Sequence, residues 1–458
     1  MHFAAVKSKV RLDATGRTIA IPALLTPAGL LTPLLDYCVH KHHIRSLSWA
    51  QKVVHAVELF LDYMHANPAQ TNSHLLFRNF AGALYSGTFD PATCTDPSGL
   101  CWLPREGKDA GDIISALSLF FDWQGENMPL AAEINPLVDA SYYDQLWNET
   151  ARRYRRDKAF LGHLWGPADN ETGKTRSVGR RRGLQVRHAE PPAFPEDRFD
   201  ELITDGFRVG NRIDHRGIAI TLLMHGAGFR VSEPFHLFVE DIIPFGGSAL
   251  VRIHHPSEGY APDSWVGPTG RPRTGKRAAY LMENFGLLPR TEYNDRQHAG
   301  WKGGLLDAKF YMQAHWLGTG YAERFSEHWM EYLHQLGRIP RPHPFAFANL
   351  SRGPTGDMYC IETFTEAHAR ACKRIGLTVD KALGTTAHGH RHAYGRRLKA
   401  GGASSEFIKI FMHHVSEDSQ KVYTGASSAE VAQELQKAQA RLAESVAKKQ
   451  ALLLTDTQ

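Results

Sequence analysis

The chain has 458 residues, of which 42% are hydrophobic and 22% are charged, values typical of a soluble globular protein. This length is sufficient for two or three domains, each with its own core. The formal net charge of only +5 permits a polyanionic partner but does not require one, so where the charges lie matters more than their sum.

Cysteine usage and hydropathy favour a reducing cytoplasm. The five cysteines form no CxxC pair, and we recognise no signal peptide at the start of the sequence. Cys94 and Cys101 are more typical of loop thiols than of metal ligands. The most apolar early stretch, residues 19–39, contains three prolines and is therefore a poor membrane span. We expect a protein without membrane contact.

The first 150 residues predict an N-terminal arm followed by a helical domain. Residues 1–44 contain turn signals and prolines that favour an arm or a short capping element. In residues 45–150, apolar side chains recur at intervals of three and four from Trp49 to Met64, as on one face of an amphipathic helix. Residues 75–85 and 108–124 are further helical candidates.

Residues 151–192 predict a flexible basic linker. Between residues 152 and 188, eleven Lys or Arg stand against three acids, and Gly and Pro interrupt the stretch. Such a segment is either a solvated connector or a strap along phosphates, where each neutralised phosphate releases a counterion. Its place between two folded blocks favours the strap. The candidate DNA-binding residues are Lys174, Arg176, Arg180, Arg181 and Arg182, together with Arg273 in the block that follows.

The second block, residues 193–426, predicts a catalytic domain that mixes helices and strands. Apolar patterns indicate a strand at 249–254, with 276–281 as its hairpin partner. Residues 285–325 have the composition of an insertion, to which we assign no role. The expected fold class is mainly α with a small antiparallel β-sheet. Helices are expected at residues 213–225, 325–336, 363–374, 388–399, 405–412 and, within a C-terminal segment of residues 427–458, at 427–449.

Three segments of the second block carry groups suited to phosphoryl transfer. The first contains Arg230 and Glu233, held between two helical segments. The second is residues 388–392, His-Gly-His-Arg-His, at the start of a helix. The third contains His414, which Tyr423 follows nine residues later.

The chemistry of these residue types favours a covalent reaction at a phosphodiester. Two guanidiniums can grip one phosphate through paired, permanently charged donors. Histidines can donate to the equatorial oxygens, where negative charge accumulates in the transition state. A tyrosine is a plausible nucleophile, and its phosphodiester conserves bond energy that hydrolysis would lose. We recognise neither a carboxylate cluster for two magnesium ions nor a Walker loop, so we expect no metal, ATP or other cofactor.

The order and context of these residues resemble the tyrosine recombinase/phage integrase family. The family's first motif is close to Gly-Leu-Arg-x-Ser-Glu, and residues 228–233 read Gly-Phe-Arg-Val-Ser-Glu. Its second motif, His-x-Leu-Arg-His, is similar to residues 388–392, where His390 replaces the leucine. Its third motif runs Leu-Gly-His and reaches a tyrosine nine residues later, as His414 does, and here His413 replaces the glycine.

The resemblance implies a site-specific DNA recombinase in which a helical core-binding domain precedes the catalytic domain. By family role, Arg230 and Arg391 clamp the scissile phosphate, and Glu233 braces the site. His388 and His414 assist with hydrogen bonds and proton handling. Tyr423 attacks the phosphate to give a 3′-phosphotyrosyl link and a free 5′-hydroxyl.

The family also places a lysine, the general acid to the leaving oxygen, in a β-hairpin after the first arginine. Arg273 and Lys276 both lie in the expected hairpin. Counting back from Tyr280 favours Arg273, whereas chemistry favours Lys276, because an arginine rarely gives up a proton. We predict Lys276.

The implied partners are a double-stranded DNA recombination site and further copies of the chain. Residues 427–458 predict a helix with one apolar stripe, which either packs on its own domain or, as in the family, docks into a neighbouring protomer of a tetramer. The resemblance further implies integration or excision of a mobile element, a place at the bacterial nucleoid, and room for accessory DNA-bending factors.

Three alternatives stay open at this stage. A type IB topoisomerase uses the same chemistry, although a core-binding domain before the catalytic one favours recombination. A DNA-binding protein that has lost catalysis is disfavoured by the intact set of site residues. A metal-dependent phosphodiesterase would use His388, His390, His392, His413 and His414. His388 and His390 are two residues apart on the expected helix, so their side chains would point in different directions. No acidic residue or cysteine completes a set of metal ligands.

Overall fold

A computed structural model of the protein describes residues 3–12, 16, 18–127, 134–158, 173–181, 191–267, 269–318, 320–351 and 353–415. The chain divides into two compact units, residues 1–185 and 186–458. Over the described residues, the structure is mainly helical with small antiparallel sheets, which confirms the predicted fold class. None of the described helices is both long and apolar enough to cross a membrane.

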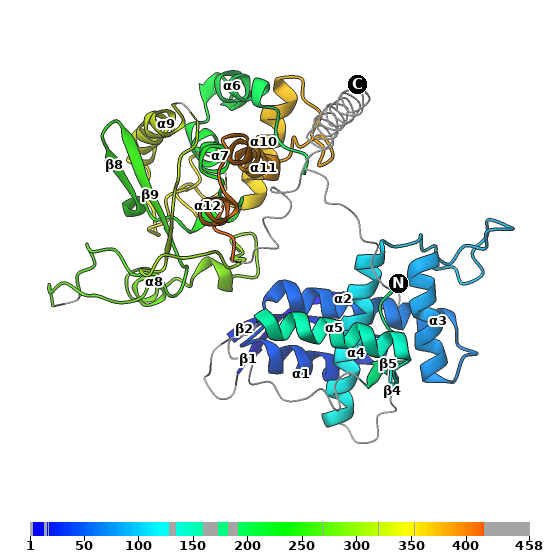
Figure 1. Ribbon diagram of the computed structural model, residues 1–458. Coiled ribbons are helices and arrows are strands. Elements are labelled where there is room, and N and C mark those ends of the chain that lie inside the picture. The colour runs from blue at the N-terminus through cyan, green and yellow to red at the C-terminus, as the bar shows by residue number, and fades with distance from the viewer. Residues whose placement is uncertain are drawn as a thin grey trace, which may run out of the picture. The chain divides into compact units, whose positions relative to one another are not determined.

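Helices packed on a small sheet form the core of the first unit (Figure 1). Phe60 contacts Phe77 and Phe80 edge to face, with ring centroids 5.7 Å and 5.3 Å apart. The helix at 47–66 begins where the Ser46 hydroxyl accepts a hydrogen bond from the N–H of Trp49. The elements are β1 (Ala4–Arg11), β2 (Thr18–Thr26), β3 (Gly29–Leu30), α1 (Thr32–Lys41), α2 (Leu47–Ala66), α3 (Ser73–Ser86) and α4 (Gly107–Asn127).

The N-terminal segment is not the arm that the sequence predicted. It forms an antiparallel sheet of order β1-β2-β3, and Ile21, Leu24 and Leu34 are buried in the core with α2 to α4. Pro22, read as a turn signal, pairs with Lys7 of β1. On its second edge, β2 pairs with β3 only at Leu25 and Thr26. At Pro22 that edge has no partner strand among the described residues, so the N–H that proline lacks is not needed there.

The basic stretch also differs from the predicted flexible linker. Its first part belongs to helix α5 (Tyr142–Lys158), and β5 (Lys174–Arg176) pairs with β4 (Leu137–Asp139) in antiparallel register. The Val178 N–H donates to Asn135 Oδ1, and Asn135 Nδ2 donates to the Val178 carbonyl, both at 2.9 Å. These buried hydrogen bonds anchor the segment to the first unit, which local composition cannot reveal.

Helix α7 (His215–Ala227) lies at the centre of the second unit, where α9 (Tyr321–Leu336) and α11 (Ala387–Ala400) pack against it (Figure 1). Every residue from 217 to 227 is buried, so α7 is enclosed on all sides. The other elements are η2 (Glu196–Arg198), α6 (Phe199–Glu201), η3 (Leu202–Gly206), β6 (Arg208–Val209), β7 (Arg212–Ile213), η4 (Glu233–His236), η5 (Val239–Asp241), β8 (Ile242–Phe245), β9 (Ser248–His254), α8 (Arg277–Phe285), η6 (Arg290–Glu292), β10 (Tyr311–Gln313), α10 (Ile361–Arg374) and α12 (Ser405–Phe411).

The larger sheet of the second unit has the order β10-β9-β8, and β6 pairs with β7 in a separate two-stranded sheet. The predicted strand is present as β9, but its predicted hairpin partner is wrong, because residues 276–281 lie at the start of α8. The supposed insertion at 285–325 supplies β10 instead, and Met312 is buried in the core. A strand of three residues has too few positions for a recognisable alternation of apolar and polar side chains.

A buried ion pair fastens α8 to this sheet. The Arg277 guanidinium donates to both carboxylate oxygens of Asp241, and its Nε donates to the Tyr260 carbonyl at 3.1 Å. Arg277 is 1% exposed and Asp241 is 6% exposed. Two charges removed from water in this way depend on each other for compensation.

Replacing Arg277 alone should therefore destabilise the second unit. We expect Arg277→Met to lower its free energy of unfolding by about 3–5 kcal/mol, because the Asp241 carboxylate is left buried without its partner. A double variant, Arg277→Met with Asp241→Leu, should recover most of this loss, since no unpaired charge remains. Urea unfolding followed by tryptophan fluorescence measures both. A single variant as stable as the double variant would contradict the expectation.

Candidate active site at the ends of α7, α11 and α12

A glycine turns the chain out of α7 toward the first candidate arginine. Gly228 has a φ of 73°, the left-handed conformation that ends many helices. A Cβ added at this position would lie 2.4 Å from the Tyr394 ring of α11. Both the backbone conformation and the closeness of Tyr394 therefore require glycine two residues before Arg230.

Arg230 is braced by Glu233, three residues further along the chain. Glu233 Oε1 accepts a hydrogen bond from Arg230 Nη1, and Oε2 accepts one from the Arg230 backbone N–H, both at 2.7 Å. The Glu233 side chain is 3% exposed, whereas that of Arg230 is 19% exposed. The carboxylate thus fixes a guanidinium that still reaches solvent, which is the geometry that a brace requires.

Arg391 joins segments that are far apart in the sequence. From the first turns of α11, its Nη1 donates to the Gly228 carbonyl at 2.5 Å and its Nη2 donates to the Met412 carbonyl at 2.6 Å. Nη1 also lies 4.0 Å from Glu233 Oε2. The guanidinium, 2% exposed, therefore connects the segment of Arg230 with the turn that carries His414.

His388 and His414 lie in the field of both arginines. Burial, followed by the positive charges of Arg391 and Arg230, lowers the pKa of His414 to about 3. His388 is exposed, yet desolvation by its surroundings, then the charges of Arg391, Lys302 and Arg230, lower its pKa to about 4. Both rings are consequently neutral near pH 7, each with one N–H donor and one acceptor nitrogen. The three sequence motifs meet at this point.

A lysine that the sequence reading overlooked acts on this cluster, and Leu305, three residues after it, donates its backbone N–H to the His413 carbonyl at 3.2 Å. Lys302 is exposed and acts on the pKa of His388, and it precedes β10 in the stretch read as an insertion. The predicted Lys276 has other contacts, since its Nζ donates to the Glu258 carbonyl at 2.8 Å and lies 4.3 Å from the Phe310 ring centroid. Its charge acts on the pKa of His255 instead. Sequence order offered one signal for this lysine, because Lys302, like Lys276, lies between β9 and the next strand, β10.

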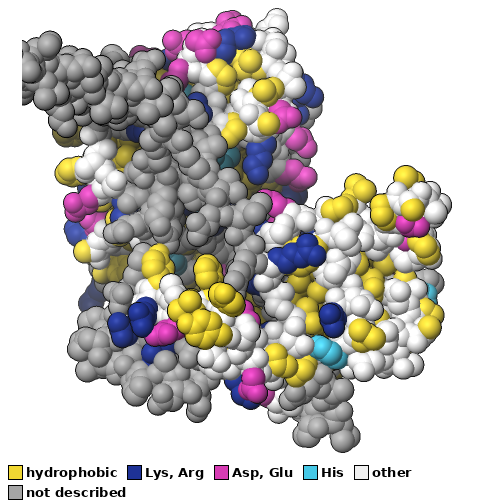
Figure 2. Space-filling model, turned by 45° about the vertical axis from the view of Figure 1, so that its right-hand side comes forward, with side chains coloured by type: hydrophobic (Ala, Val, Ile, Leu, Met, Phe, Trp, Pro, Cys, Tyr) yellow, Lys and Arg dark blue, Asp and Glu magenta, His cyan; other side chains and the backbone are white. Residues whose placement is uncertain are grey.

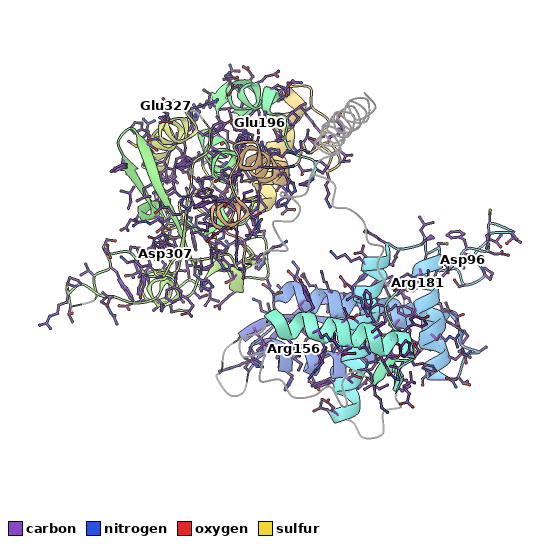
Figure 3. The ribbon with its side chains drawn as sticks, in the orientation of Figure 1. Asp96, Arg156, Arg181, Glu196, Asp307 and Glu327 are labelled. Atoms are coloured by element: carbon purple, nitrogen blue, oxygen red, sulfur yellow. The ribbon has the colours of Figure 1, made fainter. Side chains whose placement is uncertain are left out.

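The candidate DNA-binding residues of the first unit are held by its own side chains. Arg176 donates to Asp122, and Arg180 Nη2 donates to Asp112 Oδ1 at 2.9 Å. The Arg181 guanidinium lies over the Tyr85 ring, 4.2 Å from its centroid (Figure 3). Lys174 Nζ lies 3.7 Å from Asp139 Oδ1, and Arg182 is outside the described residues.

In the second unit, Arg273 donates to Glu283 and lies over the Trp265 ring. On the face drawn in Figure 2, the Lys and Arg side chains of the described residues form separate groups among hydrophobic and acidic ones rather than one continuous band.

Behind the site, three buried histidines form a chain across α7, α11 and α10. His225 Nδ1 lies 3.1 Å from His390 Nδ1, and His390 Nε2 lies 2.8 Å from His368 Nε2. The chain ends 3.7 Å further on, from His368 Nδ1 to the sulfur of Cys372. His390 and His388 point apart on α11, as the helical spacing predicted, since the former is buried and the latter exposed.

Arg397 and Glu196 both contact the outer end of this chain. Arg397 Nη1 donates to His225 Nε2 at 2.8 Å and to Glu196 Oε1 at 2.5 Å, and Glu196 Oε2 lies 3.3 Å from the same His225 nitrogen. With Nε2 as the acceptor from Arg397, His225 Nδ1–H donates to His390, and His390 Nε2–H donates to His368, whose Nδ1–H faces Cys372. With Nε2–H donating to Glu196 instead, these protons all run the other way. Each ring is neutral, and each contact has one proton.

This arrangement makes the second unit sensitive to acid. Burial lowers the pKa of His225 and of His368 to about 4, and the pKa of His390 also lies well below its usual value. Unfolded histidines bind protons below about pH 6.5, whereas the folded ones resist until about pH 4. The stabilisation is complete above pH 6.5 and is lost as the pH falls toward 4.

We expect the free energy of unfolding to fall by about 1.4 kcal/mol per pH unit for each such histidine within this window. Urea unfolding at several pH values between 7.5 and 4.5 measures the slope. His368→Met removes one titrating group and should reduce the slope by about 1.4 kcal/mol per pH unit, the contribution of one proton. Equal slopes for the variant and the wild type would show that His368 is not held neutral.

Tyr423 and the predicted C-terminal helix, residues 427–458, lie outside the described residues. Among the residues that are described, no three His, Cys, Asp or Glu side chains come together as a ligand set for a metal ion. The metal-dependent alternative therefore finds no ligand set in this part of the chain.

Neither a protein-family model nor a curated protein matches the sequence. Among solved structures, the chain is similar to the Tn1549 transposon integrase in complex with transposon right end DNA, at 11% sequence identity and a TM-score of 0.45, covering 89% of this chain and 98% of that chain. It is also similar to a lambda integrase dimer bound to a COC′ core site, at 11% identity and a TM-score of 0.43, covering 86% and 94% respectively.

A third similar structure is the XerH site-specific recombinase bound to palindromic difH substrate in a post-cleavage complex. The sequence identity is 14% and the TM-score is 0.37, with 83% of this chain and 94% of that chain covered. The residues of the site, rather than these weak similarities, carry the functional proposal that follows.

Proposed function

We propose that this chain is a site-specific tyrosine recombinase, which cleaves and rejoins DNA strands through a 3′-phosphotyrosyl intermediate on Tyr423. The observation that carries the proposal is the convergence of three distant motifs at Arg391. Its guanidinium donates to Gly228 and Met412, which brings Arg230 and His414 to one place beside His388. Two guanidiniums and two neutral imidazoles around one point suit a phosphodiester in a five-coordinate transition state.

The proposed reaction forms one bond to phosphorus and breaks another. The oxygen of Tyr423 attacks the scissile phosphate and gives its proton to a nearby base, while the bond from phosphorus to the 5′-oxygen breaks and that oxygen takes up a proton. Reversal with a different 5′-hydroxyl rejoins the strand. Neither direction consumes ATP, because the phosphotyrosine retains the energy of the original bond.

The two arginines would contribute differently. Arg230 reaches solvent and is the better placed to donate to a non-bridging oxygen of DNA. Arg391 is almost fully buried, and its charge would act through a medium of low dielectric constant while it holds the backbone on both sides. Neutral His388 and His414 can each donate one hydrogen bond to the phosphate or pass one proton.

The nucleophile is tested by trapping the covalent intermediate. Incubation with a pool of nicked DNA duplexes of randomised core sequence should yield a protein–DNA adduct that survives denaturing electrophoresis, because the nick lets the short 5′-hydroxyl strand diffuse away. Tyr423→Phe should abolish the adduct and leave DNA binding within about threefold, since it removes only the attacking oxygen.

The same assay separates the proposal from its alternatives. An adduct that persists in Tyr423→Phe would place the nucleophile elsewhere. Cleavage that stops when EDTA is added would favour the metal-dependent phosphodiesterase. Arg230→Lys is a matched variant that keeps the charge but loses the forked donors, and we expect cleavage to fall by about 10²-fold or more.

The proton donor to the leaving oxygen has two candidates, Lys276 and Lys302. We infer that Lys302 is the better one, because its charge reaches His388 whereas Lys276 is engaged with Glu258. Lys302→Ala should slow cleavage by about 10²–10⁴-fold, the usual contribution of a general acid. Lys276→Ala is the matched control and should retain a rate within about tenfold of the wild type.

A DNA substrate with sulfur in place of the bridging 5′-oxygen isolates this step, since a thiolate leaves without needing a proton. It should restore the rate of Lys302→Ala to near that of the wild type. If the sulfur substrate rescues Lys276→Ala instead, then Lys276, the residue that the sequence predicted, is the general acid.

We further propose that the reaction serves integration or excision of a mobile element. The intended substrate is a double-stranded recombination site bound by a homo-tetramer that exchanges its C-terminal helices, with accessory DNA-bending factors and a place at the bacterial nucleoid. Type IB topoisomerase activity is the nearest alternative, and a non-catalytic DNA-binding protein is the next. A two-site plasmid assay distinguishes them, because recombination joins two sites whereas relaxation needs only one.

A further inference from the structure

His413 has a backbone conformation that most residues with a Cβ adopt only rarely, although His, Asn and Asp adopt it more often than others. Its φ is 53°, in the left-handed region, where non-glycine residues are strained by about 1 kcal/mol. The integrase motif that this segment resembles has glycine at the corresponding position. A histidine here therefore accepts a backbone penalty that glycine would avoid, so its side chain needs an explanation.

The imidazole of His413 is packed between the rings of two other segments. It stacks on Phe229 with centroids 5.3 Å apart and planes 10° apart, and it lies 6.0 Å from the His315 ring. His413 is 3% exposed, and burial lowers its pKa to about 3, so the ring is neutral. Among the described residues, the contacts of the ring are these stacking contacts, and Nε2 has no hydrogen-bond partner there.

His413 contacts segments that carry groups of the proposed site. Phe229 precedes Arg230, and His413 itself precedes His414. The His413 carbonyl accepts a hydrogen bond from the Leu305 N–H at 3.2 Å, three residues after Lys302. A Cβ at Gly304 would lie 3.3 Å from that same carbonyl, so the segment of residues 302–305 packs closely against His413.

We propose that His413 is a positioning residue, which sets the spacing of Arg230, Lys302 and His414 by stacking on Phe229 and holding the 302–305 segment. It touches no reacting atom in this role. The proposal rests on the proposed function for its effect on cleavage, but its structural part, the spacing of the cluster, can be measured without DNA.

Three variants separate the ring from the backbone. His413→Gly removes the ring and relieves the strained backbone, and His413→Asn removes the ring but keeps a residue that tolerates the left-handed region. His413→Phe keeps an aromatic ring for the stack, and Phe310, with a φ of 61°, shows that phenylalanine adopts this conformation elsewhere in the chain. Cys94→Gly, at a φ of 52° in the first unit, is the matched control for relief of backbone strain alone.

The first measurement is the protonation of His414 in the full-length chain at pH 4.5 and above, followed by histidine NMR. Burial, and then the charges of Arg391 and Arg230, hold its pKa low, so a looser cluster should raise it. We expect His414 to begin to protonate by pH 4.5 in His413→Gly and His413→Asn, and to stay neutral there in the wild type, His413→Phe and Cys94→Gly. An unchanged titration in both ring-deleted variants would overturn the proposal, as would an equal rise in His413→Phe.

The second measurement is single-turnover cleavage of a nicked duplex selected from the randomised pool. With saturating DNA, His413→Gly and His413→Asn should slow adduct formation at least tenfold while the dissociation constant for DNA stays within threefold. His413→Phe should return the rate to within threefold of the wild type. A purely structural role would instead weaken binding and lower the folded fraction together, and that result would overturn the proposal.

The two proposals can fail separately. If the wild type forms no adduct but the His414 titration responds to the ring as described, then recombinase activity is wrong and the positioning role of His413 stands. If the adduct forms and neither rate nor titration responds to the ring, then the positioning role is wrong and the recombinase proposal stands.

Discussion

The site of this protein depends on one buried guanidinium. Arg391, 2% exposed, would be costly to bury if its charge and its N–H groups found no compensation. The carbonyls of Gly228 and Met412 and the nearby carboxylate of Glu233 provide that compensation. Because Gly228 and Glu233 lie 184 and 179 residues before Met412 in the sequence, satisfying one side chain brings the end of α7 to the end of α12. The geometry of the proposed site and the folding of the second unit are thus coupled through the same hydrogen bonds.

Local patterns predicted the helices well, because an amphipathic helix carries its signal within a few turns. The apolar spacing from Trp49 to Met64 falls inside α2 (Leu47–Ala66), for example. Pairings between distant segments were missed. β2 appeared to be a proline-rich arm, since its partner β1 and its buried contacts with α2 are invisible to composition. β10 was hidden in a supposed insertion, because three residues show no periodicity.

The sequence predicted those parts of the candidate site whose contacts join residues close together in the chain. The Arg230–Glu233 pair spans three residues and can be read from the sequence. Lys302 could not be found in this way, because its closeness to His388 depends on the path of the chain between β9 and β10. His390 was first considered with His388 as a metal ligand, and the structure places it on the opposite face of α11 as the middle member of the buried histidine chain.

That histidine chain has a consequence for how this protein can change during evolution. A row of single protons runs through His225, His390 and His368, and each nitrogen matches only a neighbour of the opposite kind. Replacing one member leaves a donor and an acceptor stranded in the interior, so a single substitution is worse than several made together. Related chains that carry leucine at the position of His390 should therefore have altered the positions of His225 and His368 as well, as a correlated set.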